Sequence, residues 1–145
     1  MNLFFGWLWI LMGIISGTVL GMFFHGDRWL GGYGSFKRRM YRLGHISFFG
    51  LGLLNLMFWL TVLSVTPSTA ITDIASAAFI SGGITMPICC VIMAHAPKAH
   101  MLFAVPVISL ICAGVLMVMA VSSNAMPAHA GLTPFHTQSL AHNSK

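Results

Sequence analysis

The stretch from Met101 to Val121 reads MLFAVPVISLICAGVLMVMAV and contains no charged side chain. A transmembrane helix requires about 20 predominantly apolar residues, so this stretch is long enough to span a bilayer. Three further apolar runs of similar length precede it, at 2–24, 45–65 and 70–94. None of the four runs alternates with a period of two, which argues for helices rather than a barrel. The sequence therefore predicts an all-α integral membrane protein with four spans.

The composition of the whole chain agrees with this prediction. Of its 145 residues 57% are hydrophobic and only 6% are charged, and the mean hydropathy is +0.88. Soluble domains carry about 25% charged residues. The composition thus excludes a soluble globule, and with it a nucleic-acid-binding module, in spite of a pI of 9.6. The first run is interpreted as a retained span, because no basic residue precedes it and no small-residue cleavage site follows it.

The distribution of charge predicts the orientation of the spans. Lys98 lies between the third and fourth spans, and the terminal Lys145 lies beyond the fourth. Because cytoplasmic loops are enriched in Lys and Arg, both connecting loops are expected in the cytoplasm and both termini outside. The remaining five of the seven Lys and Arg residues lie in the loop 26–44, between the first two spans: Arg28, Lys37, Arg38, Arg39 and Arg42.

Short connections at 66–69 and 96–100 complete the predicted topology. Such turns force consecutive spans to run in opposite directions, which predicts a four-helix antiparallel transmembrane bundle. The membrane domain is expected to cover residues 1–121, and residues 122–145 to form an external tail. A bacterial inner membrane is the expected location.

Small residues indicate where the helices pack. Gly13, Gly17 and Gly21 recur every four residues in the first span, a glycine zipper that lets another helix approach closely. Asn55 is an amide at membrane depth, so it is expected to form a hydrogen bond across helices or to a ligand.

Two prolines interrupt the last two predicted helices. Pro87 and Pro106 each lack a backbone donor, so each leaves a carbonyl one turn earlier without its usual partner. Those carbonyls belong to Gly83 and Leu102.

Histidines carry the candidate chemistry. His25, His45, His95 and His100 all fall at the predicted cytoplasmic ends, one per span. Cofactor sites of helical bundles lie between facing helices, and imidazole is an axial ligand of haem iron. The pattern predicts a b-type haem held by His45 and His95, with His25 as a substitute ligand. The alternative is that these imidazoles only anchor the helix ends at the interface and form hydrogen bonds with nearby carbonyls.

These histidines lie at one depth, which limits the function. A chain with ligands at a single depth cannot carry electrons across a bilayer alone. We therefore expect a small subunit of a larger electron-transfer complex, of the respiratory or photosynthetic type, that works beside other membrane subunits or with quinone. The alternative class is a cofactor-free structural or assembly subunit, whose glycine faces and tail dock partners.

Other chemistries have less support in the sequence. No nucleophile–base pair, phosphate-binding loop or pair of carboxylates occurs, so we expect an electron-carrying or structural subunit rather than an enzyme by itself. The three cysteines lie within spans and form no CxxC, which is typical of small apolar residues. A third alternative is transition-metal handling near the outer face, where thioether and imidazole groups gather at irregular spacing: Met117, Met119, Met126 and His129.

Overall fold

The computed structural model describes residues 1–26 and 28–125, and these contain helices but no strand. Each long helix, the fourth together with η2, is long and apolar enough to cross a membrane. The prediction of an all-helical chain with four helices long and apolar enough to span a membrane is therefore confirmed for the described residues. The elements in chain order are α1 (Asn2–Phe23), η1 (Trp29–Gly31), α2 (Phe36–Val65), α3 (Thr69–His95), η2 (Pro97–Phe103) and α4 (Ala104–Ala125).

The second helix begins well before the predicted span. The sequence predicts a span from residue 45, yet α2 starts at Phe36, because the Ser35 side chain accepts a hydrogen bond from the Arg38 amide and caps the helix. Hydropathy locates the part of a helix that lies in hydrocarbon, whereas Lys and Arg are good helix formers that extend it. The predicted loop 26–44 is thus a loop only as far as Ser35.

The fourth helix ends at Ala125, so its last turn covers the start of the segment expected to be an external tail. The remainder of that segment, 126–145, lies outside the described residues, and so do Met126, His129, His136 and His142. The tail therefore stays a prediction.

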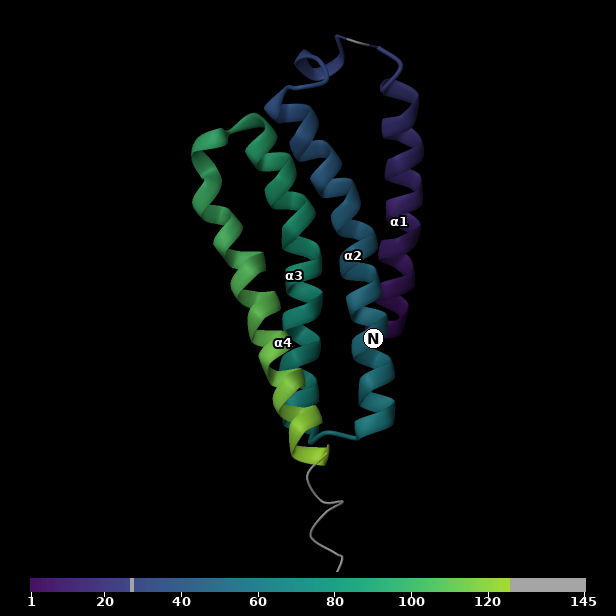
Figure 1. The fold of residues 1–145 in the computed structure, drawn as a ribbon, viewed down its shortest axis with the longest axis vertical. Helices are drawn as coiled ribbons and strands as arrows, with labels where there is room; N and C mark the ends of the chain where they lie inside the picture. Colours follow the sequence, from purple (N-terminus) through teal and green to yellow (C-terminus); the bar gives the residue numbers. More distant parts are fainter. Residues whose placement is uncertain (27, 126–145) are drawn as a thin grey trace, which may run out of the picture.

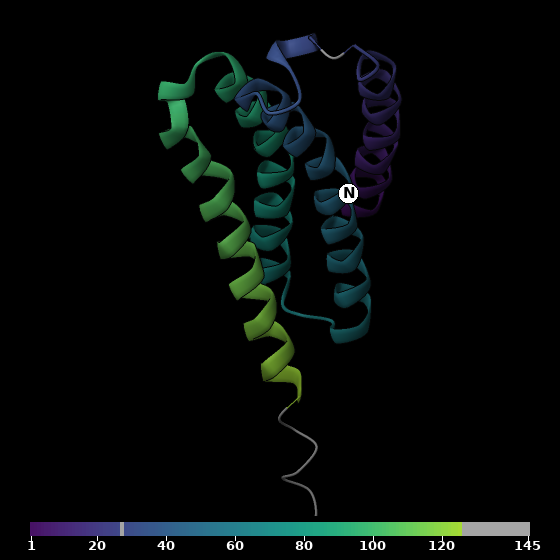
Figure 2. The same cartoon turned by 45° about the horizontal axis from the view of Figure 1, so that its top comes forward.

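The four helices form an open row (Figure 1). Packing is most extensive between α2 and α3, while α1 packs on α2 and α4 packs on α3. Figures 1 and 2 both show α1 and α4 at opposite edges. In lipid no hydrophobic gain favours closing the row into a ring, since lipid chains cover the edges equally well. We call the end that carries η1 and η2 the basic end, because Arg28, Lys37, Arg39 and Lys98 lie there.

Glycines set the approach of α1 to α2. Gly6 and Gly52 meet backbone to backbone, and a Cβ atom on Gly6 would lie 2.9 Å from the Gly52 carbonyl oxygen. Further along, Gly13 faces Phe49 and Gly17 faces His45, both of α2. A Cβ atom on Gly21, in contrast, would have no neighbouring atom within 4 Å. The tight face of α1 therefore runs through Gly6, Gly13 and Gly17.

A buried polar network joins three helices. The Asn2 amide nitrogen donates to the Asn55 side-chain oxygen over 2.9 Å, and Ser76 donates to the Asn2 side-chain oxygen. Asn55 is fully buried and donates to the Leu51 carbonyl within its own helix. The network thus ties α1 and α3 to the central helix α2.

Both carbonyls that the prolines single out accept a hydrogen bond from another element. Pro87 lies inside α3, but the prediction that Pro106 interrupts the last helix is wrong, because α4 starts at Ala104 and Pro106 lies in its first turn. The Trp9 indole N–H of α1 donates to the Gly83 carbonyl over 3.0 Å. The Cys89 thiol of α3 lies 3.4 Å from the Leu102 carbonyl of η2 and donates to it. Proline-interrupted membrane helices are tolerated when neighbouring groups satisfy the freed carbonyls in this way.

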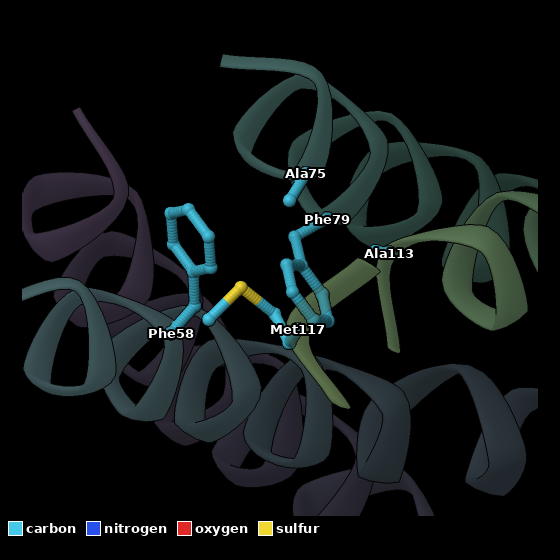
Figure 3. Close-up of a cluster of buried hydrophobic side chains, with 5 residues drawn as sticks. All are labelled: Phe58, Ala75, Phe79, Ala113 and Met117. Atoms are coloured by element: carbon cyan, nitrogen blue, oxygen red, sulfur yellow. The ribbon is translucent and has the colours of Figure 1, made fainter. Parts of the chain in front are cut away.

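The apolar core lies among α2, α3 and α4, in the half of the row away from the basic end (Figure 3). Phe58 and Phe79 pack with their ring centroids 5.3 Å apart, and the Met117 thioether lies beside them. This methionine therefore packs in the core, as an unbranched, polarizable side chain commonly does. The cluster consists of Phe58, Ala75, Phe79, Ala113 and Met117.

Candidate functional site

A groove of about 630 Å³ lies between α1 and α3, with α2 at its base. Its size is within the range of cofactor and small-molecule sites, about 300–1,000 Å³. The walls are almost wholly apolar, with aliphatic residues of α3 facing aromatic rings of α1 and α2. We call it the α1–α3 groove. The side chains used below are those of Trp9, Ser16, Tyr41, His45, Ile84 and Ile88.

The groove is a consequence of the open row. Because α1 meets α3 only through Asn2, Phe5 and Trp9, in the first half of α1, a strip of the α2 surface stays uncovered between the two helices toward the basic end. His45 lies on that strip. Its ring packs on Gly17, where a Cβ atom would lie 2.6 Å from the His45 Cε1 atom, and meets Phe49 edge-on. The absence of a side chain at residue 17 thus makes the space that the imidazole occupies.

The hydrogen bonds of His45 define its chemistry. Its Nδ1 atom lies 3.0 Å from the Ser16 hydroxyl oxygen, and that hydroxyl donates to the Gly13 carbonyl over 3.1 Å. A hydroxyl has one proton, so with that proton on Gly13 the imidazole Nδ1–H is the donor to Ser16. Nε2 then carries the lone pair, and it has no hydrogen-bond partner among the described residues. Ligand histidines are oriented in this manner, with one nitrogen held by a protein acceptor.

His95 lies in a different environment. It is the last residue of α3, is exposed, and donates from Nδ1 to the Val91 carbonyl of its own helix over 3.1 Å. It lines a second cavity, of about 550 Å³, between the start of α2 and the end of α3. Tyr41 lines the α1–α3 groove and meets the His95 ring edge-on, with centroids 6.1 Å apart.

The structure places the predicted ligands at one end of the molecule but does not bring them together. His45 and His95 line different cavities, and the Tyr41 ring lines the groove of His45 and contacts the ring of His95. His25 follows α1 in an exposed turn and lines neither cavity, and His100 is exposed in η2. The assignment of His45 and His95 to one haem therefore stays a prediction.

Sequence reasoning missed Ser16, Trp9 and Tyr41 as groove residues. Ser16 precedes Gly17 of the glycine pattern, and Tyr41 precedes His45 by about one helical turn. These spacings show that Ser16 lies beside Gly17 and that Tyr41 lies one turn from His45. They do not reveal which residue of α1 faces which residue of α2, because that register depends on the Gly6–Gly52 contact.

Arg38 belongs by sequence to the charged loop, yet it is only 2% exposed. Its guanidinium lies between two aromatic rings, 4.2 Å from the Phe24 centroid and 4.8 Å from the Tyr33 centroid. Its Nη2 atom donates to the Phe24 carbonyl over 3.2 Å. Cation–π contacts of this kind stabilise a desolvated guanidinium by about 2 kcal/mol, so Arg38 fastens the loop after α1 to α2.

No protein-family model matches the chain, and no curated protein or solved structure shows a significant similarity to it. The functional inference therefore rests on the geometry of the groove.

The donor set favours one class of cofactor. Within residues 1–26 and 28–125, no three His, Cys, Asp or Glu side chains come together to hold a metal ion. A bare ion such as zinc needs three or four protein ligands. A metal tetrapyrrole supplies four nitrogen ligands of its own and needs only one or two axial ligands, of which His45 can be one. Apolar and aromatic walls with a single basic imidazole nitrogen thus fit a haem better than a bare ion.

Proposed function

We propose that this chain is a small subunit of a larger membrane electron-transfer complex, of the respiratory or photosynthetic type. The α1–α3 groove is its b-type haem site, and His45 is the axial ligand from this chain. The observation that carries the proposal is the imidazole itself, which stands in an apolar groove with Nδ1 on Ser16 and Nε2 without a partner in the described part of the chain. When bound, the haem supplies one-electron chemistry, and the protein fixes the ligand and excludes water.

We also propose an orientation. The row is antiparallel, its basic end faces the cytoplasm, and both termini lie outside a bacterial inner membrane. The positions of Arg28, Lys37, Arg39 and Lys98 at one end support this topology through the positive-inside rule. His45 would then lie toward the cytoplasmic side, where a quinone could exchange electrons and protons near the aqueous phase.

The lining of the groove opposite His45 supports the role of a subunit. The α3 wall opposite His45 presents Ile84, Ile88 and Val91, which have no ligating atom. Both His95 and His25 would have to move to reach the groove. A ligand from a neighbouring subunit is the simpler source, because the groove opens at the surface of the row.

The competing class is a cofactor-free structural or assembly subunit. Its support is that Gly13, Gly17 and Asn55 all find partners within this chain, so these residues need no cofactor to pack against. For the handling of a transition metal, Met117 packs in the apolar core and Met119 is exposed, while Met126 and His129 lie outside the described residues. This third alternative stays a prediction.

The test is a reduced-minus-oxidised visible spectrum of the full chain, purified in mild detergent with any co-purifying subunits. We expect a haem α-band that is lost in His45→Gly, returns when imidazole is added, and persists in His95→Ala. A band lost in His95→Ala but kept in His45→Gly would overturn the ligand assignment. A colourless protein with full helical content would reject the haem site and favour the structural subunit.

A further inference from the structure

The second cavity differs from the α1–α3 groove in having a lysine in its lining. It lies at the basic end, where the Lys37 side chain from α2 and the His95 imidazole from α3 line it together. Lys37 and His95 are both exposed. Apolar side chains of Leu30, Phe36 and Pro97 form much of the remaining surface. The cavity thus combines cationic or hydrogen-bonding groups with an apolar lining.

The charge at this end lacks a counter-ion in the described part of the chain. Among the described residues the one acidic side chain is that of Asp73. It lies near the start of α3, at the opposite end of that helix from His95. The two groups are 22 residues apart along the helix, or about 33 Å at 1.5 Å per residue. Asp73 is therefore too far from Lys37 to pair with it, and Asp27, the other acidic residue of the chain, lies outside the described residues. A cavity lined by Lys37 suits an anion.

The length of α2 places this cavity at the level of lipid headgroups. The helix has 30 residues and so measures about 45 Å, which equals the thickness of a bilayer with its headgroups, about 40–45 Å. Lys37 is the second residue of α2 and therefore lies at one end of that length. An anion at this level, beside apolar walls, has the chemistry of a phospholipid phosphate above its acyl chains.

Neighbouring arginines are engaged elsewhere. Arg38 is buried between Phe24 and Tyr33, and Arg42 stacks on the same Tyr33 ring, 5.5 Å from its centroid. Lys37 makes no such contact and lines the cavity. Arg39 is exposed on α2 but lines neither cavity, which makes it a matched control for charge.

We propose that the cavity between the start of α2 and the end of α3 binds the phosphodiester headgroup of an anionic phospholipid, through the Lys37 ammonium and, as the imidazolium, His95. The Nδ1–H of His95 is taken by the Val91 carbonyl, so only the imidazolium adds an Nε2–H donor for a phosphate oxygen. A basic residue near a membrane surface contributes about 1 kcal/mol to the attraction of anionic lipid, which corresponds to about fivefold in affinity. The proposal is independent of the haem site, because it uses neither His45 nor the α1–α3 groove.

Native mass spectrometry of the full chain, released from micelles that contain equal amounts of phosphatidylglycerol and phosphatidylcholine, tests this site. We expect preferential retention of one phosphatidylglycerol. Lys37→Gln should lower its retention about fivefold, Lys37→Arg should keep it, and Arg39→Gln should change it less than about twofold. His95→Gln should lower it to a smaller extent, and the helical content of each variant is checked by circular dichroism.

Three results would overturn the proposal. Equal retention of the two lipids would show that the cavity does not select an anion. Equal losses in Lys37→Gln and Arg39→Gln would show diffuse attraction to the basic end in place of a defined site. Displacement of the lipid by millimolar glycerol phosphate would identify a soluble phosphate compound as the ligand.

Discussion

Two cavities at the basic end each contain one histidine, and they differ in what holds the ring. In the α1–α3 groove His45 is half-buried, lies on Gly17 of another helix and is oriented by Ser16. In the second cavity His95 is exposed, and its ring nitrogen bonds to a carbonyl of its own helix. An imidazole fixed by a neighbouring helix has a defined direction for a ligand. An imidazole bonded to its own helix end has no nitrogen oriented by another helix, so equal depth in the sequence does not imply an equal environment.

The largest expected effect comes from filling the space beside His45. Gly17→Ala places a methyl group 2.6 Å from the His45 Cε1 atom, so the imidazole must move. We expect at least about a tenfold loss of haem retention during purification, since displacing a ligand's support typically costs 10–100-fold. Gly21→Ala is the control, because nothing lies within 4 Å of the position that its Cβ atom would take.

The two glycine variants also test the comparison of the cavities. If Gly17→Ala and Gly21→Ala retain haem equally, contact with Gly17 does not define the direction of His45. If both variants lose haem while their helical content stays normal, haem retention depends on the general stability of the last turns of α1 and not on the contact between Gly17 and His45.

A smaller effect is expected from the hydroxyl that orients His45. Ser16→Ala removes the acceptor of the Nδ1–H and leaves the ring in place on Gly17. We expect the rate of haem transfer to an acceptor protein to rise about tenfold, at the low end of such effects. Thr18→Ala removes a hydroxyl of the same helix that bonds only to its own backbone, and should leave the rate unchanged. An unchanged rate in Ser16→Ala would mean that packing alone orients the imidazole.

A third prediction concerns the end of the groove opposite Tyr41. Trp9→Phe keeps an aromatic ring but removes the indole N–H that bonds to the Gly83 carbonyl. Interhelical hydrogen bonds in membranes contribute about 0.6 kcal/mol on average and at most about 1.7 kcal/mol. We expect the free energy of unfolding in mixed micelles to fall by about 1 kcal/mol. Trp7→Phe, at a side chain that is 62% exposed, should change it by less than half as much.

How much of this molecule follows from its sequence depends on the distance between the interacting groups. Hydropathy located the four spans to within a few residues at most ends, because spanning length is a local property. The carbonyls of Gly83 and Leu102 were singled out by the positions of Pro87 and Pro106, although only Pro87 interrupts its own helix. Their donors, Trp9 and Cys89, depend on how separate helices meet, which one sequence does not specify.

The candidate site shows the same division. That histidines gather at one end follows from their positions beside the basic residues. The choice of His45 over His95 depends on the close approach of Gly6 to Gly52, which sets Ser16 and Gly17 opposite His45. The burial of Arg38 could likewise not be predicted from the sequence, because Lys and Arg side chains near a loop usually remain in water. In this structure the rings of Phe24 and Tyr33 cover the Arg38 guanidinium.

The smallest expected effect concerns η2, whose first residue, Pro97, lines the second cavity. The Cys89 thiol bonds to the Leu102 carbonyl of η2, and a thiol is a much weaker donor than the indole of Trp9. Cys89→Ala removes this bond, whereas Cys90→Ala removes the same volume at a fully buried thiol without a hydrogen bond to described residues. We expect Cys89→Ala to lower the free energy of unfolding by only about 0.5 kcal/mol more than Cys90→Ala. A difference as large as that for Trp9→Phe would show that the hydrogen bonds beside the two cavities, Trp9 to Gly83 and Cys89 to Leu102, contribute equally to stability. The two cavities would then differ only in their histidines.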